Sequence, residues 1–326
     1  MSRKKVHGRP NIEIPKHGFN DNVGQKALSE MWPYFVGDWD KRWGKREDGE
    51  FVDDKVLEGK FLEENVIVPI IENSREKIRC MDLAAGIGLE ATRLAQEYPD
   101  FSIYANELDD HLRSILEQNL ADNKVKRRVN VQKRMWEDMC FDFNKRFDFL
   151  LNLGNAFPYI NGEAEQLKVL NQFRNLLKEN ESSRLVIDLR NWGPLARRAS
   201  ALLNKDRLPD ASNFSAFSGG PMYNGDGVHG YPVAIDRNTN SLLFRYGFTD
   251  EEKAREYGDS YLRMTKININ QMIQLLYSAR LYTKQIFGDF VPMVPKEHDR
   301  GMGTEWIRPD GVKPQFIQFV AGIMRD

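Results

Sequence analysis

Two patterns of hydrophobic and polar residues alternate through the middle of the chain. Short apolar runs, typical of buried strands, are separated by stretches with an apolar residue every three or four positions, which is typical of helices that bury one face. Strands are expected over residues 78–84, 101–107, 129–134, 146–154 and 184–190, and helices over 89–98, 111–123 and 163–180, with Leu89, Leu94 and Ala95 on the inner side of the first helix. This alternation predicts a doubly wound α/β domain with a parallel sheet, whose ligands bind at the carboxyl ends of the strands.

The chain before this repeat has a different character. Residues 1–25 are polar, with prolines and glycines, and are expected to form an arm rather than a packed element. Residues 25–75 follow a helical pattern and are rich in tryptophan. We therefore expect an N-terminal arm and helical cap over 1–75 and the α/β domain over 76–326.

After Arg190 the strand–helix rhythm stops. Residues 200–262 are rich in Gly, Asn and aromatic side chains, which indicates a β-rich insertion in the domain. A helix at 268–279 and strands at 282–290 and 315–323 are then expected to close the chain. Such a terminal pair of strands is typical of a sheet whose last member is antiparallel.

Composition excludes several classes of function. The formal net charge of −1 gives no electrostatic reason to expect nucleic acid or an anionic membrane as a partner, and no apolar stretch approaches the length of a membrane span. The cysteines, Cys80 and Cys140, have neither metal-ligand nor disulfide-framework spacing, so a reducing cytoplasm is the natural setting. The five histidines are scattered, so no protein-bound metal is expected, and no GxSxG motif marks a hydrolase nucleophile.

A glycine loop joins the first expected strand to the first expected helix in "CMDLAAGIGLEATRLA", residues 80–95. Loops of this kind hold charged or nucleotide-like ligands against backbone N–H groups at the start of a helix. With Ala91 in the third position, "GIGLEA" also fits the G-x-G-x-x-G/A pattern of dinucleotide sites, and a lone match of that kind is weak.

Three neighbouring side chains bear on which ligand the loop takes. Asp82 ends the strand before the loop, where nicotinamide-binding proteins usually have apolar residues, and an acid there can contact the amino-acid end of S-adenosyl-L-methionine. Glu107 closes the second strand and is placed to accept hydrogen bonds from a ribose diol, which both cofactors need. Trp136 follows the third strand, where its ring either lies near an adenine or a sulfonium or packs as an ordinary rim aromatic.

Beyond these residues, the sequence resembles the class I S-adenosylmethionine-dependent methyltransferases, and among them the glycine/sarcosine N-methyltransferases, from about residue 31 onward. "MDLAAGIG" is similar to their VLDVACGTG loop, "LLNLGNAFPYI" to CLGNSFAHL, "LVIDLRNW" to LVIDHRNYD and "FVGDWDKRWGKRE" to FVDKWDELIDWESR. "YANELDDHL" and "KRMWEDM" match further motifs, with Glu107 in place of Asp and Met135 in place of Asn. The resemblance implies a Rossmann-like methyltransferase sheet and S-adenosyl-L-methionine as the cofactor.

The resemblance also implies roles for individual residues. It implies cofactor contacts at Trp39, Arg46 (with Arg42 as an alternative), Asp82, Ala84, Gly86, Gly88, Glu107, Met135, Trp136 and Leu153. It implies that the acceptor is bound and positioned by Asn155, Arg190 and Tyr246, with Tyr223 ranked lower. An arginine that follows an apolar strand is costly to half-bury without an anionic partner, so Arg190 is expected to anchor an acceptor carboxylate.

The expected function is N-methylation of a small amino acid or other carboxylate-bearing amine, with glycine, sarcosine and dimethylglycine as leading acceptors. The expected partner is a small molecule rather than nucleic acid or membrane, and the sequence leaves a homo-oligomer open. Two alternatives stand beside this expectation. They are a methyltransferase for a different acceptor, such as a natural-product amine, and a protein that binds S-adenosylmethionine without turnover. An NAD-linked oxidoreductase is disfavoured by Asp82 and the "LGNAF" loop.

Overall fold

A computed structural model describes Met31 and residues 54–191, 228–236, 241–248, 250–257, 260–297, 304–314 and 316–324. An eight-stranded sheet with the order β10-β9-β13-β5-β4-β1-β2-β3 lies at its centre. The five strands expected from the alternating pattern are present and parallel: β1 Arg79–Asp82, β2 Ser102–Asn106, β3 Val129–Gln132, β4 Phe149–Asn152 and β5 Arg184–Arg190. The predicted α/β class is confirmed. The first four strands are shorter than their predicted spans, because the predicted segments run on into the turns at the strand ends.

The other edge of the sheet is antiparallel. The last strand of the chain, β13 (Phe316–Ile323), pairs antiparallel with β5 on one side and with β9 (Leu281–Gly288) on the other. The short strand β10 (Val291–Pro292) extends the edge. The predicted antiparallel strand is confirmed, and it lies inside the sheet between β5 and β9. An additional pair, β11 (Val294–Glu297) with β12 (Thr304–Ile307), was not predicted.

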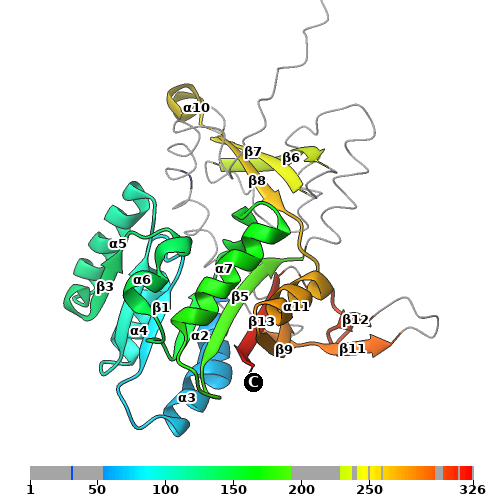
Figure 1. Ribbon diagram of the computed structural model, residues 1–326. Coiled ribbons are helices and arrows are strands. Elements are labelled where there is room, and N and C mark those ends of the chain that lie inside the picture. Colours follow the sequence, from blue (N-terminus) through cyan, green and yellow to red (C-terminus); the bar gives the residue numbers. More distant parts are fainter. Residues whose placement is uncertain are drawn as a thin grey trace, which may run out of the picture.

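Helices cover both faces of the sheet (Figure 1). One face carries α7 Glu163–Leu176 and α11 Ile269–Ser278, together with the short helices η4 Trp136–Asp138 and α6 Cys140–Phe143. The other carries α4 Leu89–Glu97, α5 Asp110–Asp122, and a helical segment made of α2 Asp54–Leu62, the π-helical turn η2 Glu63–Ile67 and α3 Val68–Asn73. Short 3₁₀ turns, η3 Lys126–Arg128 and η5 Phe157–Tyr159, follow α5 and the β4 loop.

The alternation of side chains along each strand divides the core into two layers. In β1, Met81 packs with the α7 and α11 layer, whereas its neighbour Cys80 packs with α4 and the α2–α3 segment. Leu94 and Ala95 are buried in α4 as expected, but Leu89 is only half-buried because it begins the helix at the rim of the sheet. Phe61, Leu62 and other apolar residues of the α2–α3 segment belong to the same core cluster as the sheet.

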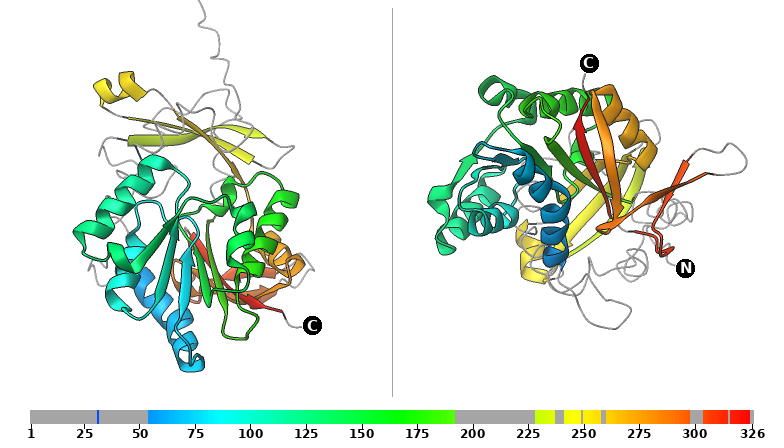
Figure 2. Two further views of the ribbon diagram at one scale, coloured as in Figure 1. Left: turned by 60° about the vertical axis from the view of Figure 1, so that its left-hand side comes forward. Right: turned by 90° about the horizontal axis from the view of Figure 1, so that it is seen from below.

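The predicted β-rich insertion contains a separate three-stranded antiparallel sheet, β6 Val228–Asp236, β7 Ser241–Phe248 and β8 Ser260–Thr265. The helix α10 (Glu251–Tyr257) connects β7 to β8 and was not predicted. Figure 1 and the side view in Figure 2 place this sheet beyond the carboxyl ends of the central parallel strands. It therefore stands over the edge at which ligands of such sheets bind.

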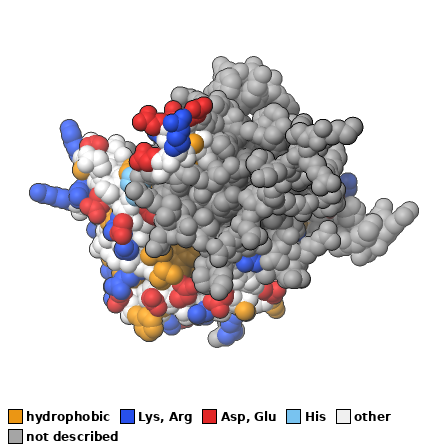
Figure 3. Space-filling view, turned by 90° about the horizontal axis from the view of Figure 1, so that it is seen from above, with side chains coloured by type: hydrophobic (Ala, Val, Ile, Leu, Met, Phe, Trp, Pro, Cys, Tyr) orange, Lys and Arg blue, Asp and Glu red, His pale blue; other side chains and the backbone are white. Residues whose placement is uncertain are grey.

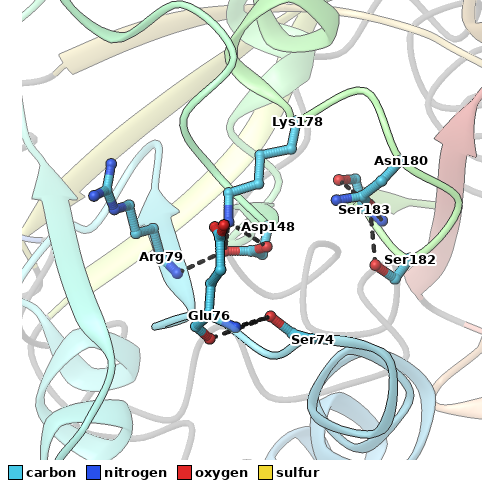
Figure 4. Close-up of polar contacts among 8 residues, drawn as sticks. All are labelled: Ser74, Glu76, Arg79, Asp148, Lys178, Asn180, Ser182 and Ser183. Carbon is cyan, nitrogen blue, oxygen red and sulfur yellow. Dashed lines mark hydrogen bonds and ion pairs between the residues drawn. The ribbon is translucent and has the colours of Figure 1, made fainter.

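The opposite, amino-terminal edge of the sheet is held by a buried carboxylate (Figure 4). Asp148 is 2% exposed, accepts a hydrogen bond from the Arg79 backbone N–H at 2.8 Å, and pairs with Lys178 Nζ at 2.9 Å. Lys178 also lies 3.6 Å from Glu76. These contacts join β1, the start of β4 and the segment after α7 at the edge away from the candidate site. They serve the fold.

Viewed from the carboxyl side, the described part of the surface carries acidic and basic side chains interspersed (Figure 3). Within the described residues, no helix has both the length and the apolar character that a membrane crossing requires.

Candidate active site

The glycine loop is a tight turn after β1. Gly86 and Gly88 both have left-handed backbone conformations, with φ of 54° and 84°. A Cβ atom on Gly88 would lie 2.8 Å from Leu116 Cγ, so this glycine also permits close packing of α4 against α5. The loop itself is anchored to β2, because the Ala85 N–H donates to the Asn106 carbonyl at 2.9 Å.

Glu107 lies directly beside this loop. Its Oε2 accepts a hydrogen bond from the Gly86 N–H at 2.8 Å, and its Oε1 accepts one from the Asp109 N–H at 2.8 Å. Burial raises the pKa of Glu107 to about 7, and the backbone N–H groups of Asp109 and Gly86 oppose that shift. A carboxylate has about four acceptor positions, so these bonds leave it capacity for further donors such as ribose hydroxyls.

Asp82 and Ala84 lie where β1 enters the loop. Asp82 is 5% exposed, and its Oδ1 accepts a 3.3 Å hydrogen bond from the Ala84 N–H. The carboxylate therefore shapes the turn that leads to Gly86. Both residues are at the carboxyl edge of the sheet, as the sequence predicts.

Trp136 and Met135 follow β3. The Trp136 indole N–H donates to the Leu83 carbonyl at 2.7 Å, and its ring meets Phe173 of α7 edge-on, with the centroids 5.6 Å apart. This half-buried ring ties the end of β1 to the α7 layer. Met135 is 48% exposed at the surface beside it.

The turn after β4 brings together predicted residues that are distant in sequence. Asn155 is a buried non-glycine residue with φ of 58°, a conformation that asparagine tolerates better than most side chains. Its N–H donates to Asp188 Oδ1 at 2.7 Å, and its Oδ1 accepts from the Arg190 N–H at 2.8 Å. Its amide Nδ2 lies 3.7 Å from Met264 Sδ in β8. These hydrogen bonds of Asn155 hold the turn against the end of β5. Leu153, at the start of the turn, is buried.

Arg190 ends β5 at the same edge. Its guanidinium lies over the Phe316 ring, with Cζ 5.2 Å from the ring centroid. Among the described residues, no carboxylate lies within ion-pair distance of this guanidinium. Tyr246 of β7 is 4% exposed; burial raises its pKa to about 12, and the positive charge of Arg190 acts in the opposite direction. Arg190 and Tyr246 are therefore close enough to interact electrostatically.

Some predicted site residues lie outside the described part of the chain, namely Trp39, Arg42, Arg46 and Tyr223. Two further polar residues at the site, Asn106 and Asp188, were not predicted from the sequence. Asn106 at the end of β2 donates to the Leu83 and Arg134 carbonyls and accepts from the Arg134 N–H, which joins three strand ends. Asp188 holds Asn155, as described above. Both are polar residues in otherwise apolar strands, Asn106 at the end of β2 and Asp188 within β5, and that contrast is the signal that could have found them.

With this geometry established, the chain can be compared with known proteins. No protein-family model matches it. It is 25% identical to a glycine/sarcosine N-methyltransferase of Halorhodospira halochloris over 80% of each chain. A glycine/sarcosine N-methyltransferase of Aphanothece halophytica is 23% identical over 78% of this chain and 81% of that protein. The resemblance inferred from the sequence motifs is confirmed.

Solved structures extend the comparison to the fold. A crystal structure of an S-adenosylmethionine-dependent methyltransferase from Clostridium acetobutylicum superposes with a TM-score of 0.57 at 15% identity, covering 92% of this chain and 99% of that one. The chain has a Rossmann-like methyltransferase fold. A protein of Pyrococcus horikoshii, with a TM-score of 0.50 at 11% identity, covers 90% of this chain and 98% of its own. In the methyltransferase fold of this chain, the glycine loop, Glu107 and Arg190 all lie along one sheet edge.

Proposed function

We propose that this protein is an S-adenosyl-L-methionine-dependent methyltransferase that N-methylates a small amino acid or another carboxylate-bearing amine. Glycine, sarcosine and dimethylglycine are the leading acceptors. The methyltransferase fold and the names of the two relatives support the cofactor and the reaction type. The main support for a carboxylate-bearing acceptor is Arg190. Its half-buried guanidinium lies at the carboxyl edge of the sheet, and it contacts an aromatic ring rather than a described carboxylate.

The residues beside the glycine loop fit the cofactor. Glu107 offers carboxylate oxygens for ribose hydroxyls at the end of β2, and the left-handed Gly86 and Gly88 keep the loop tight and carry no side chains at two of its positions. Asp82 is a buried acid at the end of β1, where the ammonium of an amino-acid group is a suitable partner. When bound, S-adenosylmethionine supplies a methyl group on a positively charged sulfur.

The work left to this chain is chiefly binding and orientation. A guanidinium fork matches a carboxylate in a bidentate fashion, so Arg190 fixes one end of the acceptor and leaves the amine end to be directed at the methyl group. Holding two reactants in line can lower a barrier by about 7–11 kcal/mol, without acid–base chemistry by the protein. The amine attacks in its unprotonated form, so turnover should rise toward alkaline pH with the ionisation of the acceptor itself.

A screen of acceptors with isotopically labelled cofactor tests the function, with products identified by mass. Glycine, sarcosine and dimethylglycine are compared with unrelated amines that lack a carboxylate. Turnover of the carboxylate-bearing amines supports the proposal. Tight cofactor binding without turnover of any amine would refute it and favour a binding protein instead.

The substitution Arg190→Lys tests the anchor. Lysine keeps the charge but cannot form the bidentate fork, so kcat/KM for the best acceptor should fall steeply while cofactor affinity stays nearly unchanged. Arg184→Lys is a matched control, because Arg184 begins the same strand at the opposite edge of the sheet. Near-normal efficiency of the Arg190→Lys variant would show that the acceptor is not held by its carboxylate.

A further inference from the structure

Phe316 of β13 lies directly opposite Arg190 of β5. The two strands pair antiparallel with these residues in register (Figure 1). Their strand neighbours Ile317 and Leu189 belong to the core layer of α7 and α11, so the alternation of side chains places Phe316 and Arg190 together on the opposite face of the sheet. Arg190 Cζ lies 5.2 Å from the centroid of the Phe316 ring. The ring and the guanidinium are therefore cross-strand neighbours in contact.

The backbone that carries the Phe316 ring is held by Asp289. The Phe316 N–H donates to Asp289 Oδ1 at 2.9 Å, and the Asp289 N–H donates to the Phe316 carbonyl at 3.0 Å. Asp289 lies in the turn after β9 with a left-handed φ of 48°, and its Oδ2 is 3.5 Å from Arg308 Nη1. Such a conformation is costly for a non-glycine residue and persists where surrounding contacts fix it. The Phe316 ring is therefore attached to a rigid part of the sheet.

The backbone of Arg190 is fixed as well, because its N–H donates to Asn155 Oδ1 at 2.8 Å. The long side chain is the part that retains rotational freedom, and an arginine that becomes immobilised on binding loses much rotamer entropy. Stacking on a ring uses the face of a guanidinium and leaves its N–H donors, which lie in the guanidinium plane, for a carboxylate. A ring in contact with Arg190 can therefore orient the guanidinium without occupying its donors.

We propose that Phe316 is a positioning residue that holds the Arg190 guanidinium ready for the carboxylate of the acceptor. This inference rests on the proposed function, in which Arg190 is the anchor, and Phe316 is not among the site residues predicted from the sequence. A preoriented guanidinium fork loses less freedom when it binds, so it favours acceptors that carry a planar carboxylate. The Phe316 ring therefore contributes to acceptor specificity through Arg190.

The variant Phe316→Leu tests this role, because leucine keeps an apolar side chain and removes the aromatic face. For the acceptor that the wild type methylates best among glycine, sarcosine and dimethylglycine, kcat/KM should fall by about 5- to 30-fold, as for a lost cation–π contact. The loss should come from a higher KM at nearly constant kcat. Phe316→Tyr keeps the ring and should retain wild-type kinetics. Cofactor affinity, measured by calorimetry, should be the same in all three proteins.

A matched control separates positioning from packing. Phe319→Leu is the same substitution in the same strand, at a buried residue of the α7 and α11 core layer. It should lower the melting temperature and leave the KM of the acceptor unchanged. The primary amide of the same acceptor lacks the negative charge, so Phe316→Leu should change kcat/KM for the amide much less than for the amino acid.

The outcomes distinguish this role from the proposed function. An unchanged KM in Phe316→Leu, on an amino acid that the wild type methylates, would overturn the role of Phe316 and leave the proposed function intact. Equal losses in Phe316→Leu and Phe316→Tyr, in Phe316→Leu and Phe319→Leu, or on acid and amide would also overturn it. A wild type that methylates no carboxylate-bearing amine would refute the proposed function itself, and the role of Phe316 with it.

Discussion

The ionisation of Glu107 should make cofactor binding depend on pH. With a pKa of about 7, the carboxyl group is charged in about one molecule in ten at pH 6 and in about nine in ten at pH 8. Ribose hydroxyls donate to the charged form, so binding selects the carboxylate and releases a proton. If the bound form stays ionised over this range, the dissociation constant for S-adenosylmethionine should be about tenfold weaker at pH 6 than at pH 8.

Isothermal titration calorimetry at several pH values measures this dependence directly. The control is Glu107→Gln, which is isosteric and neutral and keeps an acceptor oxygen near the Gly86 N–H. The amino group of the cofactor also titrates near neutral pH, and that contribution is common to both proteins. The difference between them therefore isolates the side chain. Wild type and variant with the same affinity at pH 8 and the same slope would refute the assignment of Glu107 to the ribose.

The same pKa has a consequence for stability. An unfolded glutamate titrates near pH 4.3, so between about pH 4.3 and 7 the folded protein binds more protons than the unfolded chain does. The free energy of unfolding contributed by Glu107 should therefore be highest below that range and fall as pH rises through it. Chemical denaturation of wild type and Glu107→Gln should show this divergence, and parallel curves would argue against the raised pKa.

Two further predictions concern the framework of the fold. Asp148→Asn should lower the free energy of unfolding by about 2–4 kcal/mol. This is somewhat below the value for a fully buried ion pair, because Lys178 is partly exposed. A loss of under 1 kcal/mol in denaturant titrations would show that the ion pair adds little stability. Gly88→Ala should cost about 2–3 kcal/mol through its left-handed backbone and the contact with Leu116, whereas Gly311→Ala, with φ of 74° and open space around it, should cost only about 1 kcal/mol. Equal losses in the two glycine variants would show that the packing against Leu116 is unimportant.

Hydrophobic periodicity determined the parallel strands of the central sheet and the main helices that join them. The alternation of apolar runs and helical stretches predicts β1 to β5 and their helices. The spacing of apolar residues along a segment shows by itself whether the segment buries one face or both. It also predicts that Asp82, Glu107 and Arg190 end strands and meet at one edge, since parallel strands share a carboxyl side. The observed strands are shorter than predicted, and Leu89 is half-buried rather than buried. In both cases the pattern of apolar residues extends beyond the end of the strand or the buried part of the helix.

The partners of the polar side chains were decided by the tertiary structure. No local pattern places β13 between β5 and β9, and that order brings Phe316 under the Arg190 guanidinium. The hydrogen bond from the Trp136 indole to Leu83 and the bonds that join Asn155 to β5 likewise depend on strand order and on loop conformation. A hydrogen bond is directional and short in range, so which groups it joins follows from how distant segments pack, whereas hydrophobic burial needs only a side chain that faces inward.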